Sequence, residues 1–265
     1  MTDQTAAAQL RAGRLGDAIA AAQAALKKAP MNLEARVLLV ELLVFAGNLE
    51  RADTLLDAAT TIDPSASLVA AEFRQLLRAE TARRQLFIDG RVPEFLGEPT
   101  EAQRHQLAAL VALRAGDGAE AARAVARAEE TRPAAPGLHG DTPFDDFRDA
   151  DDLLAGSFEV LTSTGKYFWI PTERVISAEF HSPSRQRDLI WRRVSMSVAD
   201  GPEGDVYMPA TYAADEPLTD ALRLGRETDW RELDGGLVRG VGQRVFLAGD
   251  DGIDVLSLGT LRFGA

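Results

Sequence analysis

Apolar side chains recur every three to four positions through residues 5 to 131, a spacing typical of amphipathic helices. This segment is rich in Ala, Leu, Glu and Arg and has few β-branched runs. From Ser157 onward, short runs of Val, Ile, Phe and Trp alternate with Gly, Pro and Asp, which is typical of strands joined by turns. The pattern predicts an α+β protein with a helical N-terminal part and a small, mainly antiparallel β domain.

The helical part repeats itself with a period of 34 residues, the period of tetratricopeptide repeats. This shift superposes Gly13 on Gly47, Leu15 on Leu49, Ala18 on Ala52, Ala25 on Ala59 and Pro30 on Pro64. The glycines allow a tight turn between paired helices, the alanines at 18 and 52 allow close helix approach, and the prolines stop the second helix. A weaker third instance runs from Gly116 to Pro133.

The pattern beyond the second repeat predicts one long irregular helix from about Ser67 to Leu86. A crossover through Gly90 to Pro99 and a last helix pair at about 101–114 and 117–131 follow. In such repeats the first helices of the pairs line a concave face that can hold a peptide or a helix. The predicted groove residues are Val37, Glu41, Val44, Phe45, Leu68, Gln75 and Arg78. The alternative is that Val37, Val44 and Phe45 are core residues.

The stretch from Arg132 to Gly137 contains two prolines and a glycine, which neither a helix nor a strand tolerates well. We therefore predict a tetratricopeptide-like helical domain at 1–132 and an α+β domain with a mostly antiparallel sheet at 133–265. Its candidate strands are 157–162, 167–171, 174–180, 189–198, 204–209, 244–248 and 254–262. A turn at Thr164-Gly165 should join the first two as a hairpin.

Composition narrows the class of partner. The net charge of -12 repels nucleic acids and anionic membranes, so neither is expected as a partner. Cysteine is absent, as is common in a reducing cytoplasm. The start of the chain lacks the features of a secretory signal, and no apolar run reaches the roughly 20 residues of a membrane span. We expect a cytoplasmic protein.

Candidate catalytic and metal-binding motifs are weak. His105, His139 and His181 show no metal-ligand spacing, no nucleophile elbow is present, and the glycines from 236 to 242 lack the lysine of a phosphate loop. The acidic segment 144–152 is compatible with a cation site, or with the start of a helix before Leu153. We expect no enzyme activity, no cofactor and no bound metal.

Five motifs carry the aromatic and charged residues of the second half. They are Phe147-Arg148-Asp149-x-Asp151-Asp152, Tyr167-Phe168-Trp169-Ile170-Pro171, Arg187-Asp188-Leu189-Ile190-Trp191, Val206-Tyr207-Met208-Pro209-Ala210-x-Tyr212 and Leu224-Gly225-Arg226-x-Thr228-Asp229-Trp230. In order and spacing they resemble the ImpE family, also called TagJ or SciE-type proteins, which are accessory components of bacterial type VI secretion. The helical repeats fit this family too.

The resemblance implies a non-enzymatic protein that binds the N-terminal helix of the small contractile-sheath subunit and assists handling of the sheath by a ClpV-type unfoldase. It supplies no catalytic residues. We predict that the motif side chains support the sheet, with an exposed aromatic site for a partner as the alternative. These are Tyr167, Trp169, Pro171, Arg187, Asp188, Trp191, Pro209, Tyr212, Arg226, Asp229 and Trp230.

A different function is kept as an alternative. Pockets often form where two domains meet, so the chain could be a small-molecule hydrolase or a ligand-binding protein with a site at the junction. Asp188 and Asp229 would then supply carboxylates. Converging carboxylates with raised pKa values would favour this alternative, and a filled apolar junction would count against it.

Overall fold

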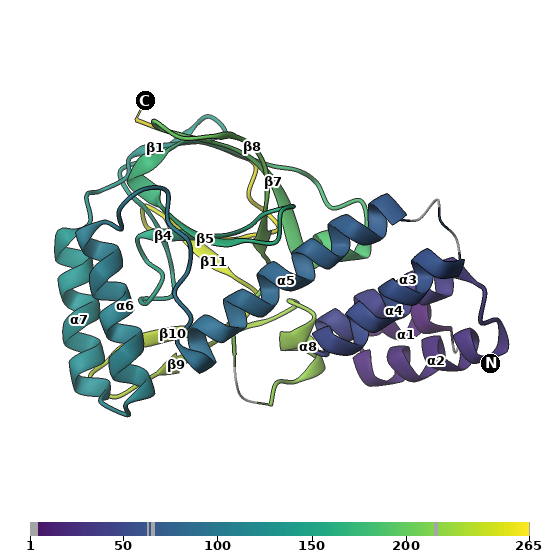
Figure 1. Cartoon of the computed structure of the whole chain (residues 1–265). Helices are drawn as coiled ribbons and strands as arrows, with labels where there is room; N and C mark the ends of the chain where they lie inside the picture. The colour runs from purple at the N-terminus through teal and green to yellow at the C-terminus, as the bar shows by residue number, and fades with distance from the viewer. Residues whose placement is uncertain (1–4, 63, 65–66, 215–216, 265) are drawn as a thin grey trace.

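A computed structural model describes residues 5–62, 64, 67–214 and 217–264. Figure 1 shows a strongly curved sheet on one side of the molecule and the first four helices on the other, with the long helix α5 crossing between them. Helices α6 and α7 stand at the far end of α5, beside the sheet. Among these described residues, no helix is long and apolar enough to cross a membrane.

The first four helices form the two predicted repeats. Their bounds are α1 Ala6–Arg11, α2 Leu15–Lys28, α3 Leu33–Phe45 and α4 Leu49–Ile62. Gly13 and Gly47 have φ values of 77° and 80°, a left-handed conformation that glycine adopts without strain and that closes the turn within each pair. Ala18 and Ala52 are fully buried, because a small side chain is needed where the paired helices approach. The predicted helical repeats are confirmed.

Three more helices follow: α5 Ser67–Asp89, α6 Glu101–Arg114 and α7 Gly118–Thr131. The last two form the predicted helix pair, closed by Gly116 at φ 76°. Thr100 and Gln103 cap the start of α6 with reciprocal hydrogen bonds, which satisfy backbone donors there. The crossover between α5 and α6 adds Glu94 to the sheet, where its backbone bonds to Tyr167 and Trp169.

Every strand ladder in the described part of the chain is antiparallel. The eight-stranded sheet has the order β2-β1-β13-β6-β7-β8-β4-β5, beside a sheet β12-β11-β3 and the hairpin β10-β9. The strands are β1 Gly137–His139, β2 Thr142–Phe144, β3 Phe147–Asp149, β4 Ser157–Leu161, β5 Tyr167–Pro171, β6 Val175–Phe180, β7 Trp191–Val198, β8 Glu203–Pro209, β9 Thr228–Glu232, β10 Val238–Gly242, β11 Val245–Ala248, β12 Asp251–Asp254 and β13 Thr260–Phe263. A four-residue helix α8, Asp220–Arg223, precedes β9.

Comparison with the expected strands gives one confirmation and two corrections. The hairpin of β4 and β5 turns at Gly165 as predicted. The single strand predicted at 254–262 is wrong, because Asp254 accepts hydrogen bonds from the backbone of Leu256 and Ser257 and turns the chain. The strand predicted from 189 begins only at 191, after a 3-10 helix η3, Gln186–Leu189. Strands β1 to β3, β9, β10 and β12 had not been predicted, and three of them have only three residues.

The alternative of a helix start before Leu153 is also wrong. Residues 152–156 form turns. Asp151 accepts hydrogen bonds from the backbone of Leu153 and Gly240 and from the Arg239 side chain, which holds the chain in a compact loop. Asp151 of this acidic segment therefore binds an arginine and backbone N–H groups.

The main hydrophobic core is shared between the helices and the sheet. It joins helix residues such as Leu43 and Phe73 to Trp169 and Trp191 of the strands. A second core lies among the strands and stacks Phe147 against Phe246 at a ring distance of 5.3 Å. Helix α7 ends at Thr131 and β1 begins at Gly137, and the domain limits at 132 and 133 stay a prediction.

Candidate functional site

The protein's own second half covers the inner face of α3. Glu41, Val44 and Phe45 from the predicted groove are 8%, 3% and 8% exposed, and η3 packs against this helix. Val44 and Phe45 belong to the main core, as the alternative interpretation held. The concave face of the repeats is thus filled at α3 by residues of the same chain.

The Arg187–Trp191 motif also contacts α5. The Arg187 guanidinium pairs with Glu72 at 3.4 Å and lies 5.5 Å from the centre of the Phe73 ring. Trp191 meets the same ring edge-on at 5.7 Å and donates a hydrogen bond to Glu80 at 3.3 Å. Arg187 therefore pairs with α5, and not with its neighbour Asp188.

Glu41 of α3 is buried and interacts with Arg187. Burial raises the pKa of its carboxyl to about 7, although a hydrogen bond from the Arg187 backbone and the Arg187 charge oppose that rise. Asp188 behaves differently. Burial acts to raise the pKa of its carboxyl, but hydrogen bonds from Ser184 and Arg185 outweigh burial and lower it.

A buried charge cluster joins α5 to the sheet. Glu159 of β4 accepts hydrogen bonds from Arg83 at 2.9 and 3.0 Å and also bonds to Arg244 and the Tyr167 hydroxyl. Arg244 continues to Asp149 at 2.8 Å. Burial acts to raise the pKa of Glu159, but the two guanidinium groups and the hydrogen bonds outweigh it and lower the pKa to about 2. This carboxylate therefore stays ionised in the folded protein.

Most of the predicted motif residues lie inside the fold. Trp169 donates to the Tyr167 hydroxyl at 2.6 Å, and Tyr212 donates to Asp149 at 2.9 Å. Pro171 and Pro209, which end β5 and β8, are buried. Sequence reasoning missed the acidic and basic members of this network, Glu72, Glu80, Arg83, Glu159 and Arg244. One signal was present, because Glu159 is the only charge in a strand that is buried on both faces.

Three motif residues lie at the surface. Arg226 donates to the carbonyl groups of Leu10 and Arg11, which closes the end of α1. Asp229 is exposed, and Trp230 is 41% exposed with its ring 6.1 Å from that of Tyr212. Arg226 and Asp229 show no ion pair with one another among the described residues.

The remaining predicted groove residues are less buried. Leu68 is 81% exposed near the start of α5, Val37 and Gln75 are half-buried, and Arg78 is exposed. Arg78 lines an open groove of about 1010 Å³ between α5, the α3–α4 turn and the Gly165 turn. Its α5 side is formed by Leu77, Arg78, Thr81, Arg84, Gln85, Ile88 and Asp89. We call this surface the α5 groove.

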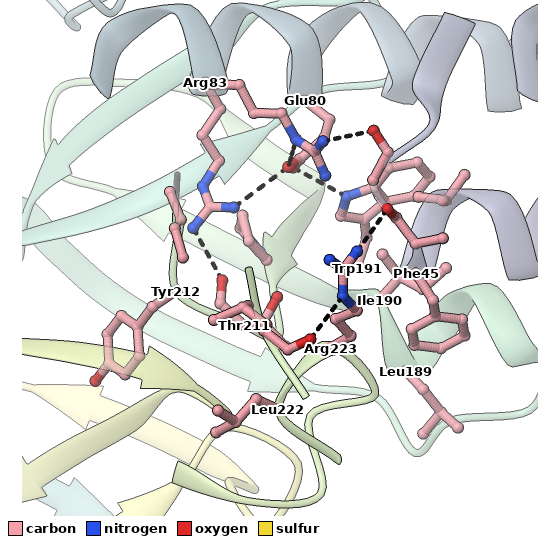
Figure 2. Close-up of a pocket in the computed structure, with 18 residues that line it drawn as sticks. Phe45, Glu80, Arg83, Leu189, Ile190, Trp191, Thr211, Tyr212, Leu222 and Arg223 are labelled. Atoms are coloured by element: carbon pink, nitrogen blue, oxygen red, sulfur yellow. Dashed lines mark hydrogen bonds and ion pairs between the residues drawn. The ribbon is translucent and has the colours of Figure 1, made fainter. Parts of the chain in front are cut away.

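A second pocket, of about 220 Å³, lies where the helices meet the strands, and we call it the junction pocket (Figure 2). It shares Ala46, Gly47 and Arg84 with the α5 groove. Glu80, Arg83 and Arg223 line it together with Phe45 and Trp191. The carboxyls with strongly raised pKa, Glu41 and Asp149, do not line it, and neither do Asp188 and Asp229. The carboxylates of the hydrolase alternative are therefore not brought together in it. Within the described ranges, no cluster of three or more metal-ligating side chains is present.

Comparisons with known proteins agree with the motifs. The sequence model for the ImpE protein family matches residues 141–262, and a tetratricopeptide repeat model matches residues 9–74. The type VI secretion system accessory component TagJ of Pseudomonas aeruginosa is 38% identical over 240 residues, which cover 90% of this chain and 83% of that protein.

A solved structure shows the same fold. The crystal structure of protein VPA1032 from Vibrio parahaemolyticus superposes with a TM-score of 0.92 at 29% identity, over 98% of this chain and 97% of that one. The likeness therefore extends through both the helical repeats and the sheets. With the family match in its β part and 38% identity along most of its length, the chain belongs to the ImpE family.

Proposed function

We propose that this protein is a cytoplasmic, non-enzymatic accessory component of a type VI secretion system. In this proposal it binds the N-terminal helix of the small contractile-sheath subunit and assists handling of the sheath by a ClpV-type unfoldase. The observation that carries the proposal is the 38% identity to the accessory component TagJ over 90% of the chain. The tetratricopeptide-like repeats add support, because such repeats serve protein–protein contact.

We place the bound helix in the α5 groove. The α5 residues that line it, from Leu77 to Asp89, recur on one face of the helix over about 18 Å, a little more than three helical turns. Ile88 on this face is 59% exposed, which offers an apolar anchor. Charges of both signs line the groove, Arg78 and Arg91 together with Glu50, Asp53 and Asp89, so charged side chains can fix the register of a partner helix.

The predicted groove list is retained only in part for this role. Arg78 lines the α5 groove, and Gln75 lies against the Gly165 turn at its edge. Val44 and Phe45 are core residues. A charged substitution at either position would destabilise the fold, so a loss of binding could not be assigned to the groove. Exposed groove residues make better probes.

The first experiment is co-purification with the small sheath subunit, either intact or without its N-terminal helix. We expect retention of the intact subunit and loss of the shortened one. Ile88→Glu should weaken binding by about tenfold or more, since a charge replaces an apolar anchor. Ile176→Glu is the matched control, because Ile176 is 51% exposed on β6 and does not line the groove. Equal retention of both subunit forms would refute the proposal.

The unfoldase step needs its own measurement. Purified sheath, ClpV-type ATPase and ATP would be mixed with and without this protein, and sheath disassembly followed by light scattering. We expect faster disassembly with the wild-type chain than with the Ile88→Glu variant. A rate that is the same with the protein present or absent would leave the binding proposal standing and remove its role in sheath handling.

A further inference from the structure

The junction pocket is built from segments far apart in the sequence. The end of α3, the middle of α5, the start of β7, the segment after β8 and helix α8 all contribute to it. Its volume of about 220 Å³ is below the roughly 300–1,000 Å³ of pockets for drug-sized ligands. The space therefore suits a ligand about the size of a single amino acid.

One wall of the junction pocket is apolar. Phe45, Leu189, Ile190 and Trp191 lie together on one side in Figure 2, and Leu222 lies apart from them. Side chains of this kind bind the hydrocarbon part of a small ligand by removing it from water. They offer few hydrogen bonds, so the polar contacts must come from the other wall.

The other wall carries an excess of positive charge. Three arginines line the pocket, Arg83, Arg84 and Arg223, against Glu80 as the one acid among its described lining residues. Glu80 is already shared, since it lies 3.4 Å from Arg83 and 3.2 Å from Arg84. Arg83 is further neutralised by Glu159. Arg84 keeps the shared Glu80 as its partner, whereas Arg223 has no carboxylate partner among the described residues.

The guanidinium groups of Arg84 and Arg223 are both anchored at the end of α3. Arg84 donates through Nη1 to the carbonyl of Gly47 at 2.8 Å, and Arg223 donates through Nη1 to the carbonyl of Ala46 at 2.8 Å. The two carbonyl groups are consecutive in the chain, so both side chains converge on the end of α3. The partial negative charge of a helix C-terminus favours cations there, but it amounts to only about half a charge.

Arg84 and Arg223 each have hydrogen-bond donors that the bonds to the end of α3 do not use. The other hydrogen bonds of Arg84 and Arg223 use Nε, to Glu80 and to the Leu218 carbonyl. Their Nη2 atoms have no hydrogen-bond acceptor among the described residues. Figure 2 shows the Arg223 guanidinium reaching toward the centre of the pocket, below Trp191 and beside Phe45.

We infer that the junction pocket binds a carboxylate that carries an apolar body of amino-acid size. The carboxylate accepts hydrogen bonds from Nη2 of Arg84 and Arg223, and the apolar body packs against Trp191 and its neighbours. Planar guanidinium groups match the geometry of a carboxylate. Such a carboxylate occurs both in a free organic acid and in the last residue of a peptide chain.

The experiment uses the full chain and calorimetric titration with N-acetyl-L-leucine, compared with N-acetyl-L-leucinamide. We expect the acid to bind about tenfold or more tightly than the amide, because charge-assisted hydrogen bonds exceed neutral ones. The net charge of -12 repels the acid in general, so a preference for it has to come from the site. Equal binding of acid and amide, or no binding of either, would overturn the inference.

A second pair of probes separates the two sources of carboxylate. A six-residue peptide ending in leucine is compared with its C-terminal amide. If the free-acid peptide binds like the acetylated amino acid, the pocket takes the end of a protein chain. If only the acetylated amino acid binds, it takes a small organic acid. Either result supports a carboxylate site.

Variants locate the site. Arg84→Gln and Arg223→Gln should each weaken binding of N-acetyl-L-leucine by about tenfold. Arg193→Gln is the matched control, because Arg193 is 46% exposed in its pair with Asp205 and lies outside the pocket. If all three variants weaken binding equally, or none does, the acid binds elsewhere and the inference fails. Arg84 also lines the α5 groove, whereas Ile88 and Arg223 each line only one of these two sites. The Ile88→Glu variant should therefore bind the acid like the wild type, which separates this test from helix binding.

Discussion

Arg83 of α5 and Glu159 of β4 form a buried ion pair in which both carboxylate oxygens accept from the guanidinium, at 2.9 and 3.0 Å. The two residues lie 76 positions apart and are 3% and 0% exposed in their side chains. The pair joins the helical repeats to the sheet, and Arg244 shares the same carboxylate. The two halves of the chain are therefore connected by charge as well as by apolar packing.

The first prediction concerns this cluster. Glu159→Gln should lower the free energy of unfolding by about 3–5 kcal/mol, because Arg83 and Arg244 lose their shared buried counter-charge. Urea denaturation measures the loss. Asp205→Asn, which breaks the exposed pair with Arg193, should cost about 1 kcal/mol or less. Equal losses in the two variants would contradict the assignment.

The same carboxylate predicts an acid limit to stability. The pKa of Glu159 falls from 4.5 to about 2 on folding, so the folded state holds this group ionised where the unfolded state protonates it. Its contribution is present above pH 4.5 and is lost as the pH falls toward 2. The free energy of unfolding, measured by denaturation across this pH range, should change less with pH for Glu159→Gln than for the wild type.

Glu41 predicts a pH dependence of the opposite sign. Burial raises the pKa of its carboxyl from 4.5 to about 7, so the contribution of Glu41 to stability is most favourable below pH 4.5 and is lost as the pH rises through 7. Glu41→Gln removes this loss and should gain up to about 3 kcal/mol above pH 7. Denaturation at several pH values tests it, with the exposed Glu34→Gln on the same helix as control. A Glu41→Gln profile parallel to the wild type would contradict the prediction.

Two tryptophans of the family motifs should differ in their effect. Trp169 is fully buried and hydrogen-bonded to Tyr167, so Trp169→Ala should cost about 3–5 kcal/mol. Trp230 is 41% exposed, so Trp230→Ala should cost about 1 kcal/mol. Chemical denaturation of both variants measures the difference. A large loss for Trp230→Ala would show that its ring packs more tightly than its exposure indicates.

Gly240 tests the contact between the β9–β10 hairpin and Tyr212. A Cβ at Gly240 would overlap the Tyr212 ring, so Gly240→Ala should cost about 1–3 kcal/mol from overpacking. Gly204→Ala in β8 is the control, since nothing lies within 4 Å of its added Cβ. The melting temperatures of both variants, measured by thermal unfolding, test this prediction. A melting temperature for Gly240→Ala equal to that of the control would mean that the hairpin shifts freely.

The sequence by itself determined the elements that depend on local pattern. The period of 34 residues placed the paired helices, because glycine turns and buried alanines are local requirements of helix packing. Alternation of apolar runs with turn residues placed β4 to β8 within two or three residues. Strands as short as β1 to β3 were not predicted, since three residues carry too little pattern to be recognised.

Only the tertiary structure decided what lies in the concave face of the repeats and which charges meet. Residues 186–191 fill that face at α3, so Val44 and Phe45 are core although their helical spacing fitted a groove equally well. Glu159 meets Arg83 and Arg244 across 76 and 85 positions of sequence. Helical spacing says which side chains share a face but not what covers it, and long-range charge pairs depend on how the halves dock.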